Sequence, residues 1–271
     1  MTDTHLDHLK EKHARFFLRQ LATTKPDAVV SCGDMSEATE LSVHLGWVRE
    51  ILDGIPFYFV NGNHDYYRGS IAGVRQSLAS YSDPAGSLVY LTHSPPVQLA
   101  PNIMLVGHDG WYDGRLGDWF KSRIIMTDYA AIAEFRHQSR AMTKLLMEDL
   151  ANHSANKIAA TPVTSKRVII ATHVPPFREC SRGPDRNESD ADWLPVMSSK
   201  IMGDVILRLG REHPATEFTV LCGHTHTPWK ARVAPNVECI VGDADATGKS
   251  GYGHPMWTML EIDNDALPRA T

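Results

Sequence analysis

The chain has 271 residues, 42% of them hydrophobic, which is enough to bury the core of one large α/β domain rather than two small ones. Its formal net charge of −5 offers no excess of basic residues to a nucleic-acid backbone, so a nucleic-acid partner is not expected. No apolar run is long enough for a membrane span and no signal sequence is evident, which predicts a cytoplasmic protein.

The N-terminal segment contains the first candidate ligands. Asp3 and His5 place a carboxylate and an imidazole two residues apart, a spacing that lets both reach one cation from an extended or loop backbone. Only two residues precede Asp3, so the strand expected before this motif is absent or truncated, and a metal held next to a fraying terminus would bind weakly. Residues Leu9 to Leu21 then have the spacing of an amphipathic helix.

Four short apolar runs are each predicted to form a buried strand that ends in polar residues able to bind a metal. Glycine follows three of these runs and allows the backbone to turn sharply above the sheet edge. Ligands bind at the carboxyl ends of strands in open α/β sheets, so the four ends predict one polynuclear metal site. The runs and the residues after them are 28–32 before Gly33-Asp34, 57–60 before Gly62-Asn63-His64-Asp65, 168–172 before His173, and 218–222 before Gly223-His224-Thr225-His226.

The remaining segments complete an alternation of strands and helices that is typical of an α/β fold. Further helices are predicted over 41–52, 71–78 and 127–155, the last as one long helix within a possible helical cap or insertion at 112–165. Further strands are predicted over 88–91 and 103–106, and three antiparallel strands over 229–233, 237–241 and 257–262 complete a second sheet. We expect a single domain over residues 1–271.

Two loops are candidates for substrate contacts. The first, Gly107 to Arg115, is rich in glycine, aromatic and charged residues, so His108, Asp113 or Arg115 either faces the substrate or belongs to an ordinary structured turn. The second, Arg178 to Asp192, is rich in Ser, Gly, Pro, Asp and Asn, and is predicted to be a mobile surface loop able to act as a lid. The four cysteines lack CxxC spacing and are interpreted as reduced thiols.

The strand-end residues have the chemistry of a two-metal centre. Divalent cations of intermediate hardness take nitrogen and oxygen ligands, and a carboxylate between two of them can bridge both. Two such metals would hold a water as hydroxide at neutral pH and clamp a phosphoryl group for in-line attack. His64 is left over and is suited to protonate the leaving oxygen as general acid. The expected ligands are Asp3, His5, Asp34, Asn63, His173, His224 and His226.

In their order along the chain these motifs resemble those of the calcineurin-like metallophosphoesterase family. The motifs are Asp3-Thr4-His5, Gly33-Asp34, Gly62-Asn63-His64-Asp65, His173 and Gly223-His224-Thr225-His226. The resemblance implies a four-layer αββα sandwich of two mixed β-sheets flanked by helices, with a dinuclear site at the carboxyl ends of the strands. It further implies that Asp3, His5 and His226 hold one metal, that Asn63, His173 and His224 hold the other, and that Asp34 bridges them. The metals used in the family are manganese, iron, zinc or nickel.

The sequence departs from the protein phosphatase branch of this family. There, an Asp-Arg-Gly element follows the bridging aspartate; here Glu37 keeps the acid but Ala38 replaces the arginine, so protein phosphatase activity is not expected. Glu37 or Asp65 would orient His64, and Glu37 could instead favour a helix N-terminus. Arg115, or Arg178 or Arg182 on the second loop, would hold phosphate. The Asp3 to Leu6 start is closest to the bacterial cyclic-nucleotide phosphodiesterase-like branch.

The sequence therefore predicts a metal-dependent hydrolase of phosphate esters acting on a small or nucleotide-like substrate, either a monoester or a diester. One alternative is a nuclease of the same fold, which would require a basic groove or an accessory domain. The other is a binding relative that has lost catalysis.

Overall fold

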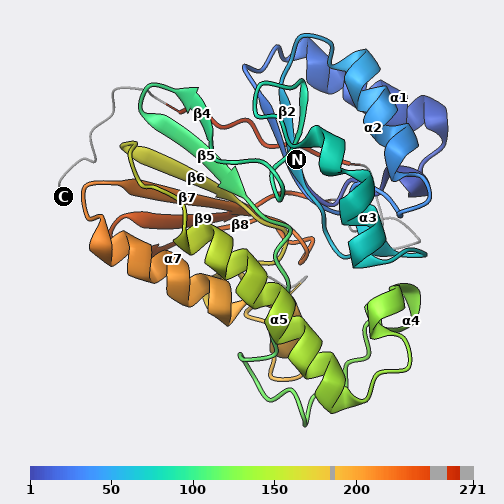
Figure 1. Ribbon diagram of the computed structural model, residues 1–271, viewed down its shortest axis with the longest axis vertical. Coiled ribbons are helices and arrows are strands. Elements are labelled where there is room, and N and C mark those ends of the chain that lie inside the picture. The colour runs from blue at the N-terminus through green and yellow to red at the C-terminus, as the bar shows by residue number, and fades with distance from the viewer. Residues whose placement is uncertain (184–186, 245–254, 263–271) are drawn as a thin grey trace.

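The computed structural model describes residues 1–183, 187–244 and 255–262. Two β-sheets lie face to face and helices cover the outer face of each, so the order of layers is helix, sheet, sheet, helix (Figure 1). This arrangement confirms the predicted α/β sandwich. The strands are β1 Val29–Cys32, β2 Phe57–Val60, β3 Leu88–Tyr90, β4 Val97–Ala100, β5 Ile103–Gly107, β6 Arg167–Ala171, β7 Glu217–Cys222, β8 Trp229–Ala234 and β9 Val237–Val241.

The two sheets differ in strand direction. In the described residues the smaller sheet has the order β1-β2-β3 with parallel pairs only, whereas the larger sheet has the order β4-β5-β6-β7-β9-β8 and is mixed. In the larger sheet β5, β6, β7 and β9 run parallel, and β4 and β8 pair antiparallel at its edges. The strands that carry candidate ligands, β1, β2, β6 and β7, are thus interior or parallel members whose carboxyl ends face the same side of the sandwich.

Three hydrophobic clusters correspond to the interfaces between the layers. Alternation along each strand divides its side chains between two clusters: Phe57 and Phe59 face the helices over the smaller sheet, while Tyr58 and Val60 face the other sheet. Val168 and Ile170 of β6 likewise face helices, and Ile169 and Ala171 face the central interface. Burial on both faces explains why these strands are continuous apolar runs in the sequence.

The helices are α1 Glu11–Thr23, α2 Leu41–Ile51, α3 Ile71–Ser77, α4 Asp128–Ala131, α5 Arg140–Ala159, α6 Leu194–Met197 and α7 Lys200–Glu212. Of these, α1, α2 and α7 are clearly amphipathic. Helices α1 and α2 lie over the smaller sheet, whereas α5 and α7 lie over the larger one, with α4 set apart near one end of α5 (Figure 1). Helix α7 was not predicted from the sequence, although the buried residues Ile201, Ile206 and Leu209 of this helix have helical spacing.

Two predicted elements are wrong. The single helix over 127–155 is broken into α4, a 3-10 turn at Ala133–Phe135, and α5, which begins after Ser139; the Ser139 hydroxyl accepts a hydrogen bond from the Met142 amide and caps the new helix. Residues 257–262 form no strand, and Trp257 packs its ring on Phe17 of α1, 5.4 Å between centroids, instead of joining a sheet. Of the three antiparallel strands expected in the last third, only β8 and β9 form, and β9 also pairs parallel with β7.

The N-terminal segment runs beside β1 without being assigned as a strand. The Met1 amino group donates to the Val30 carbonyl, the Cys32 amide donates to Met1, and the Asp3 and His5 amides donate to Gly33 and Asp34. These bonds hold residues 2–6 in a buried position. Asp3 and His5 therefore have a backbone anchor of the kind that a preceding strand would otherwise supply.

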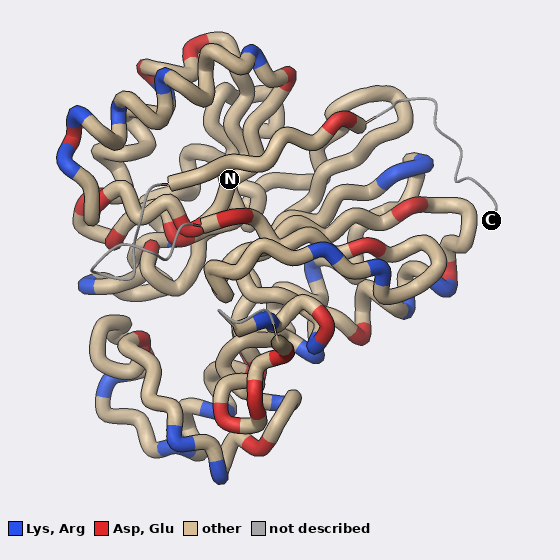
Figure 2. The backbone as a smooth tube through the Cα atoms, turned by 180° about the vertical axis from the view of Figure 1, so that it is seen from behind, with Lys and Arg blue, Asp and Glu red and all other residues tan. Residues whose placement is uncertain are grey.

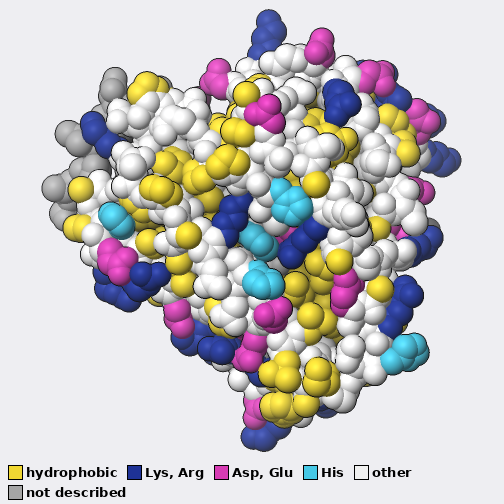
Figure 3. Space-filling model, in the orientation of Figure 1, with side chains coloured by type: hydrophobic (Ala, Val, Ile, Leu, Met, Phe, Trp, Pro, Cys, Tyr) yellow, Lys and Arg dark blue, Asp and Glu magenta, His cyan; other side chains and the backbone are white. Residues whose placement is uncertain are grey.

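Charged side chains of both signs are distributed over the molecule. On the face of Figure 3, Lys and Arg alternate with Asp and Glu, and the tube seen from behind shows the same mixture along α1 and α2 (Figure 2). Within the described part of the chain, no helix has both the length and the apolar character that crossing a lipid bilayer requires.

Candidate metal centre

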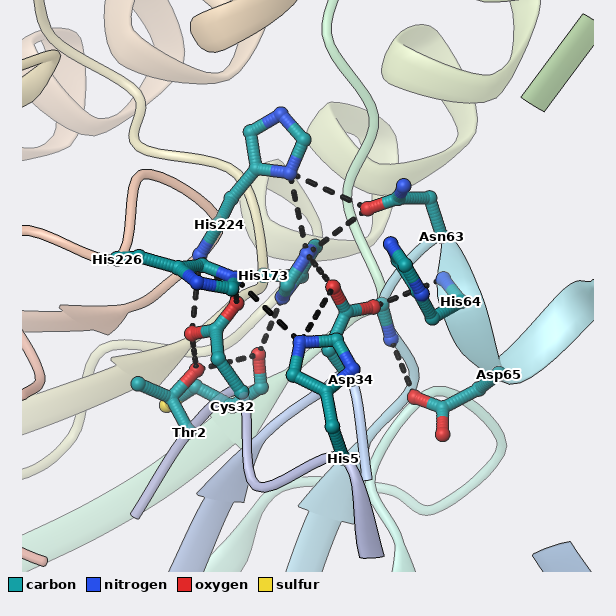
Figure 4. Close-up of polar contacts among 12 residues, drawn as sticks. Thr2, His5, Cys32, Asp34, Asn63, His64, Asp65, His173, His224 and His226 are labelled. Atoms are coloured by element: carbon teal, nitrogen blue, oxygen red, sulfur yellow. Dashed lines mark hydrogen bonds and ion pairs between the residues drawn. The ribbon is translucent and has the colours of Figure 1, made fainter. Parts of the chain in front are cut away.

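Seven ligand-type side chains converge where the two sheets meet. Asn63 and the neighbouring His64 enter from the smaller sheet, and His224 and His226 enter from the opposite side, with Asp34 and His173 between them (Figure 4). The predicted ligands thus lie together although they are far apart in sequence; His5 and His226, for example, are 221 residues apart. The parallel strands β1, β2, β6 and β7 all end at this point.

The first group of ligands contains Asp3, His5 and His226. His226 Nε2 lies 3.3 Å from Asp3 Oδ1 and 3.4 Å from His5 Nε2. Together with Asp34, these residues bring one ligand atom each to within 4.8 Å of one another, a separation that suits a single bound cation. The Asp3 carboxylate is held in place because it accepts hydrogen bonds from the Thr2 hydroxyl (2.6 Å) and the His224 amide (3.0 and 3.1 Å).

The second group contains Asn63, His173 and His224. Asn63 Oδ1 lies 3.1 Å from His173 Nε2 and 3.2 Å from His224 Nδ1, and the two ring nitrogens are 3.3 Å apart. Asp34 connects the groups, because its Oδ2 lies 3.3 Å from His173 Nε2 and 3.9 Å from His5 Nε2. One carboxylate oxygen is therefore close to both sets of ligands, as a bridging ligand must be.

Hydrogen bonds on the far side of two rings select the ligand nitrogen. His173 Nδ1 lies 2.8 Å from the Cys32 carbonyl oxygen, which can only accept, so Nδ1 carries the hydrogen and Nε2 faces the centre. His224 Nε2 lies 2.9 Å from the Val196 carbonyl oxygen, which leaves Nδ1 to face the centre. Such carbonyl contacts orient metal-binding histidines and fix their tautomers.

The backbone is strained at the ligand positions. Among the described residues, five of the eight non-glycine residues with positive φ are candidate ligands. A left-handed conformation costs about 1 kcal/mol or more for such a residue and persists where the surrounding structure enforces it. The five are Asp3 (49°), His5 (39°), Asp34 (51°), His224 (70°) and His226 (52°). These five left-handed residues therefore lower the stability of the fold, and their conformation directs the side chains toward one point.

Two glycines let the ligand loops approach one another. A Cβ on Gly62 would collide with the Asp34 carboxylate and with the His173 ring, whose nearest atom would be 2.7 Å away. A Cβ on Gly223 would collide with Thr2 and with the Asp3 carboxylate. Glycine is required at both positions because the ligand side chains occupy the space that a side chain would need.

The electrostatics of the cluster favour a bound cation. Burial raises the pKa of the Asp34 carboxyl, but His173, His64 and His5 outweigh burial and hold that pKa well below its usual range. Burial opposes charge on His173, yet the Asp34 carboxylate outweighs it and raises the pKa of His173 to about 10. Burial lowers the pKa of His5 to about 3 and that of His224 to about 4, so these rings are neutral donors near pH 7. A metal ion and a proton compete for His173 Nε2.

This donor set fits the metals implied by the resemblance. Imidazole nitrogens, two carboxylates and one amide oxygen, arranged in two groups around a shared carboxylate, suit divalent transition metals. No thiolate competes for the ion, because burial raises the pKa of Cys32 to about 12 and its backbone carbonyl, rather than its sulfur, contacts a ligand.

His64 lies beside the ligands rather than among them. Its amide donates to Asp34 Oδ1 at 2.8 Å, and its ring stacks on Tyr67 with 4.2 Å between centroids and 30° between planes. The ring also meets His5 edge to face at 4.7 Å. His64 is partly exposed and lines the cavity in front of the cluster.

The two acids predicted to orient His64 have other contacts. Glu37 forms an ion pair of 2.7 Å with the Arg68 guanidinium. The Asp65 carboxylate accepts hydrogen bonds from the amides of Met35 (3.0 Å), Ser36 (2.9 Å) and Gly62 (2.8 Å), which fixes the loop after β2 to the loop after β1. Asp65 thus positions the loop that carries Asn63 and His64.

The residues predicted to contact substrate lie elsewhere. His108 is buried and its Nδ1 lies 2.8 Å from the Ser154 hydroxyl of α5. Arg115 pairs with Glu148 at 3.0 Å, and Asp113 accepts from the Ile201 amide at 2.6 Å. Arg178 begins a 3-10 turn, Arg178–Cys180. None of the four lines the cavity at the metal cluster, so their predicted role in substrate binding has no support from their positions.

A cavity of about 240 Å³ opens onto the cluster. Asp34, Asn63, His64, His224 and His226 form its polar side. The remaining lining residues are largely apolar or aromatic, and they come from the turn after His64, from the segment before α4, and from the loop and helix after His173. These residues are Tyr67, Ile125, Met126, Thr127, Trp193 and Met197.

Asp128 was not predicted from the sequence, although it contacts the site. Asp128 is fully buried at the start of α4, and it accepts hydrogen bonds from Asn63 Nδ2 (2.9 Å), Tyr67 (2.6 Å) and Tyr112 (2.5 Å). Burial, together with the charge of Asp128, raises the pKa of both tyrosines, so their hydroxyls stay protonated and donate. No apolar strand precedes Asp128, which is why strand-end reasoning misses it.

A two-sheet α/β sandwich with this ligand set at its strand ends defines a class of metal-dependent phosphoester hydrolases. The profile of the calcineurin-like phosphoesterase family matches residues 1–228. The chain therefore belongs to the calcineurin-like phosphoesterase family, and it is a phosphoric ester hydrolase. No curated protein sequence matches the chain significantly.

Solved structures share the fold at low sequence identity. Phosphopantetheinyl hydrolase from Mycobacterium tuberculosis is 15% identical, with a TM-score of 0.65 and an alignment that covers 89% of this chain and 86% of that one. A dimetal phosphatase from Danio rerio is 18% identical, with a TM-score of 0.52 and coverage of 86% of this chain and 77% of that one. At such identities the likeness concerns the fold.

Proposed function

We propose that the protein hydrolyses a phosphate ester of a small or nucleotide-like molecule at two divalent metal ions. Asp3, His5 and His226 would hold one ion, Asn63, His173 and His224 the other, and Asp34 would bridge them. The observation that carries the proposal is the position of Asp34 Oδ2, which lies 3.3 Å from a ring nitrogen of the second group and 3.9 Å from one of the first.

When bound, the two ions would supply Lewis acidity to the phosphoryl oxygens and lower the pKa of a water molecule. The chain supplies the rest. The neutral amide of Asn63 adds an oxygen ligand without adding negative charge, which leaves the centre attractive to a phosphate. His64, partly exposed beside Asp34, donates a proton to the leaving oxygen. Asp65 positions the loop that carries His64, and Glu37 acts on the same loop through Arg68.

The cavity supports an ester with an apolar or flat organic group. One side of it is the ligand cluster, and the other presents Ile125, Met126, Trp193 and Met197, of which Ile125 is 83% and Trp193 42% exposed. Exposed large apolar side chains next to a polar centre favour a ligand with both characters. Two solved neighbours, one described as a phosphopantetheinyl hydrolase and one as a dimetal phosphatase, agree with phosphoester chemistry.

Monoester and diester substrates both fit this description, and so do manganese, iron, zinc and nickel. A nuclease is the alternative within the fold, and the mixed charges on the face of Figure 3 do not favour it. We place the reaction in the cytoplasm, and the four thiols of the structure, all free and buried, agree with a reducing compartment.

The test combines metal content with hydrolysis. Mass spectrometry of the purified protein should find about two transition-metal ions per chain. Hydrolysis of p-nitrophenyl phosphate and bis-p-nitrophenyl phosphate with added Mn²⁺ then distinguishes monoesterase from diesterase. Fewer than two ions together with no hydrolysis of either ester in excess Mn²⁺ would refute the proposal and favour a binding relative.

Substitutions separate the roles of the residues. Asp34→Ala and Asn63→Ala should abolish hydrolysis while the far-ultraviolet circular dichroism stays unchanged; survival of activity in either would contradict the two-metal assignment. His64→Gln should slow turnover and keep both metals, with the exposed His93→Gln as its matched control. Loss of metal in His64→Gln would make His64 a ligand instead of an acid.

A further inference from the structure

Asp128 connects the segment that lines the cavity to the metal ligands. It directly follows the cavity residues Ile125, Met126 and Thr127, and its side chain is fully buried behind Asn63. One oxygen, Oδ1, accepts from Asn63 Nδ2 at 2.9 Å. A carboxylate cannot donate, so the amide must turn its NH₂ toward Asp128 and its Oδ1 toward His173 and His224.

The same carboxylate reaches two further site residues through tyrosines. Tyr67 donates to Oδ1 at 2.6 Å, and its ring stacks on His64 at 4.2 Å. Tyr112 donates to Oδ2 at 2.5 Å, and its ring lies nearly parallel to that of His224, 6.0 Å between centroids and 21° between planes. A single acid therefore supports a ligand directly, and a second ligand and the general acid through aromatic contacts.

We propose that Asp128 is a positioning residue that fixes the Asn63 amide and thereby sets the affinity of the metal position formed by Asn63, His173 and His224. The inference rests on the proposed two-metal function. Asp128 directly follows the cavity-lining segment 125–127 and hydrogen-bonds to Asn63. A shift of that segment should therefore change the geometry of this metal position, and a change in the metal position should shift the segment. The hydrogen bonds to Asp128 come from Asn63, Tyr67 and Tyr112, whereas Asp3, His5 and His226 belong to the other metal position.

The experiment measures metal binding rather than turnover. Metal-free wild-type protein, Asp128→Asn and Asp128→Ala are titrated with Co²⁺, and the visible absorption bands and calorimetry give the affinity of each of the two positions. Removing the partner of a metal ligand costs about 10- to 100-fold in affinity, so Asp128→Ala should weaken one position by that factor and leave the other unchanged. Asp128→Asn keeps an oxygen acceptor of the same shape but loses the charge, so it should weaken the same position by about 10-fold, the lower end of that range.

Two controls make the outcome decisive. Asp118→Ala removes an exposed carboxylate that lies earlier in the same connection between β5 and α4 and should change neither affinity. Tyr112→Phe keeps the ring beside His224 but removes the hydroxyl that donates to Asp128. It should therefore weaken Co²⁺ binding at the position formed by Asn63, His173 and His224 by less than Asp128→Ala does. If Asp128→Ala does not fold, Asp128→Asn decides the question alone.

The outcomes separate this inference from the proposed function. Wild-type protein that binds two Co²⁺ ions, with folded Asp128 variants that bind both at wild-type affinity, would overturn the inference alone. An equal weakening of both positions would also overturn it, since that result indicates general loosening of the fold. Wild-type protein that binds no metal would overturn the proposed function and the inference together.

Discussion

Asp109, a buried carboxylate just after β5, should be required for stability. Its Oδ2 accepts hydrogen bonds from Tyr66 (2.5 Å) and Tyr90 (2.6 Å) and pairs with Arg75 (3.0 Å), while its Oδ1 accepts from the Asn61 amide (2.8 Å) and from a threonine hydroxyl. Asp109→Asn places an NH₂ group against Arg75 in one amide orientation and against the Asn61 amide in the other. Neither partner can accept a hydrogen bond.

The expected cost follows from this geometry. Breaking a buried ion pair by removing one charge costs about 3–5 kcal/mol, and the Arg75 side chain left behind is only 17% exposed. We therefore expect Asp109→Asn to lower the free energy of unfolding in urea by about 3 kcal/mol or more. Asp204→Asn, which breaks an exposed pair with Lys200, is the control and should leave the midpoint unchanged. A loss below about 1 kcal/mol for Asp109→Asn would refute the reasoning.

The same substitution should change the acid sensitivity. Burial raises the pKa of Asp109, but the charge of Arg75 and the hydroxyl hydrogen bonds outweigh burial and hold that pKa well below its usual range. A depressed pKa stabilises the fold fully above the unfolded value of about 4, and the stabilisation is lost as the pH falls through the folded value. The stability difference between wild type and Asp109→Asn should therefore be constant near pH 7 and shrink below about pH 4. A difference that grows in acid would contradict this assignment.

Three further predictions concern the site. Gly62→Ala places a methyl group against Asp34 and should lower kcat/KM about 100-fold with loss of metal. Gly46→Ala is the control, because its methyl group would meet nothing within 4 Å, and it should change neither quantity. Equal kinetics for the two variants would contradict the close approach of Gly62 to Asp34. Trp193→Ala should raise KM for bis-p-nitrophenyl phosphate about 10-fold with kcat retained, and an unchanged KM would exclude Trp193 from the substrate surface. Removing metal with a chelator should lower Tm, and free Mn²⁺ at 100 times its Kd should restore about 2.7 kcal/mol of stability; a Tm independent of Mn²⁺ would show that the centre does not bind it.

The sequence predicts those site residues that directly follow an apolar strand. Asn63, His173 and His224 each follow an apolar run, and parallel strands bring their carboxyl ends to one edge. Asp128 could not be predicted in this way, because it follows no strand and contacts Asn63 from a short helix 65 residues away in the sequence. No local sequence pattern indicates such a contact.

The missed elements have similarly physical reasons. Residues 127–155 contain neither glycine nor proline, so the break before Ser139 has only the capping residue itself as a signal. Residues 257–262 contain apolar residues at near-alternate positions, but Trp257 packs on Phe17 of α1. Alternation shows that a segment has an apolar face and not what that face contacts. His108 and Arg115 looked like pocket residues because of their composition, but their contacts with Ser154 and Glu148 turn them toward α5.

The spread of the ligands along the chain has a consequence for folding. His5 and His226 are 221 residues apart, and one sheet contributes Asn63 while the other contributes His173. Closing loops of this length is slow compared with forming local helices, so the complete ligand set exists only after both sheets have docked. Metal uptake during refolding should therefore be a late event. A metal-sensitive signal would report the docking of the two sheets rather than the formation of either sheet alone.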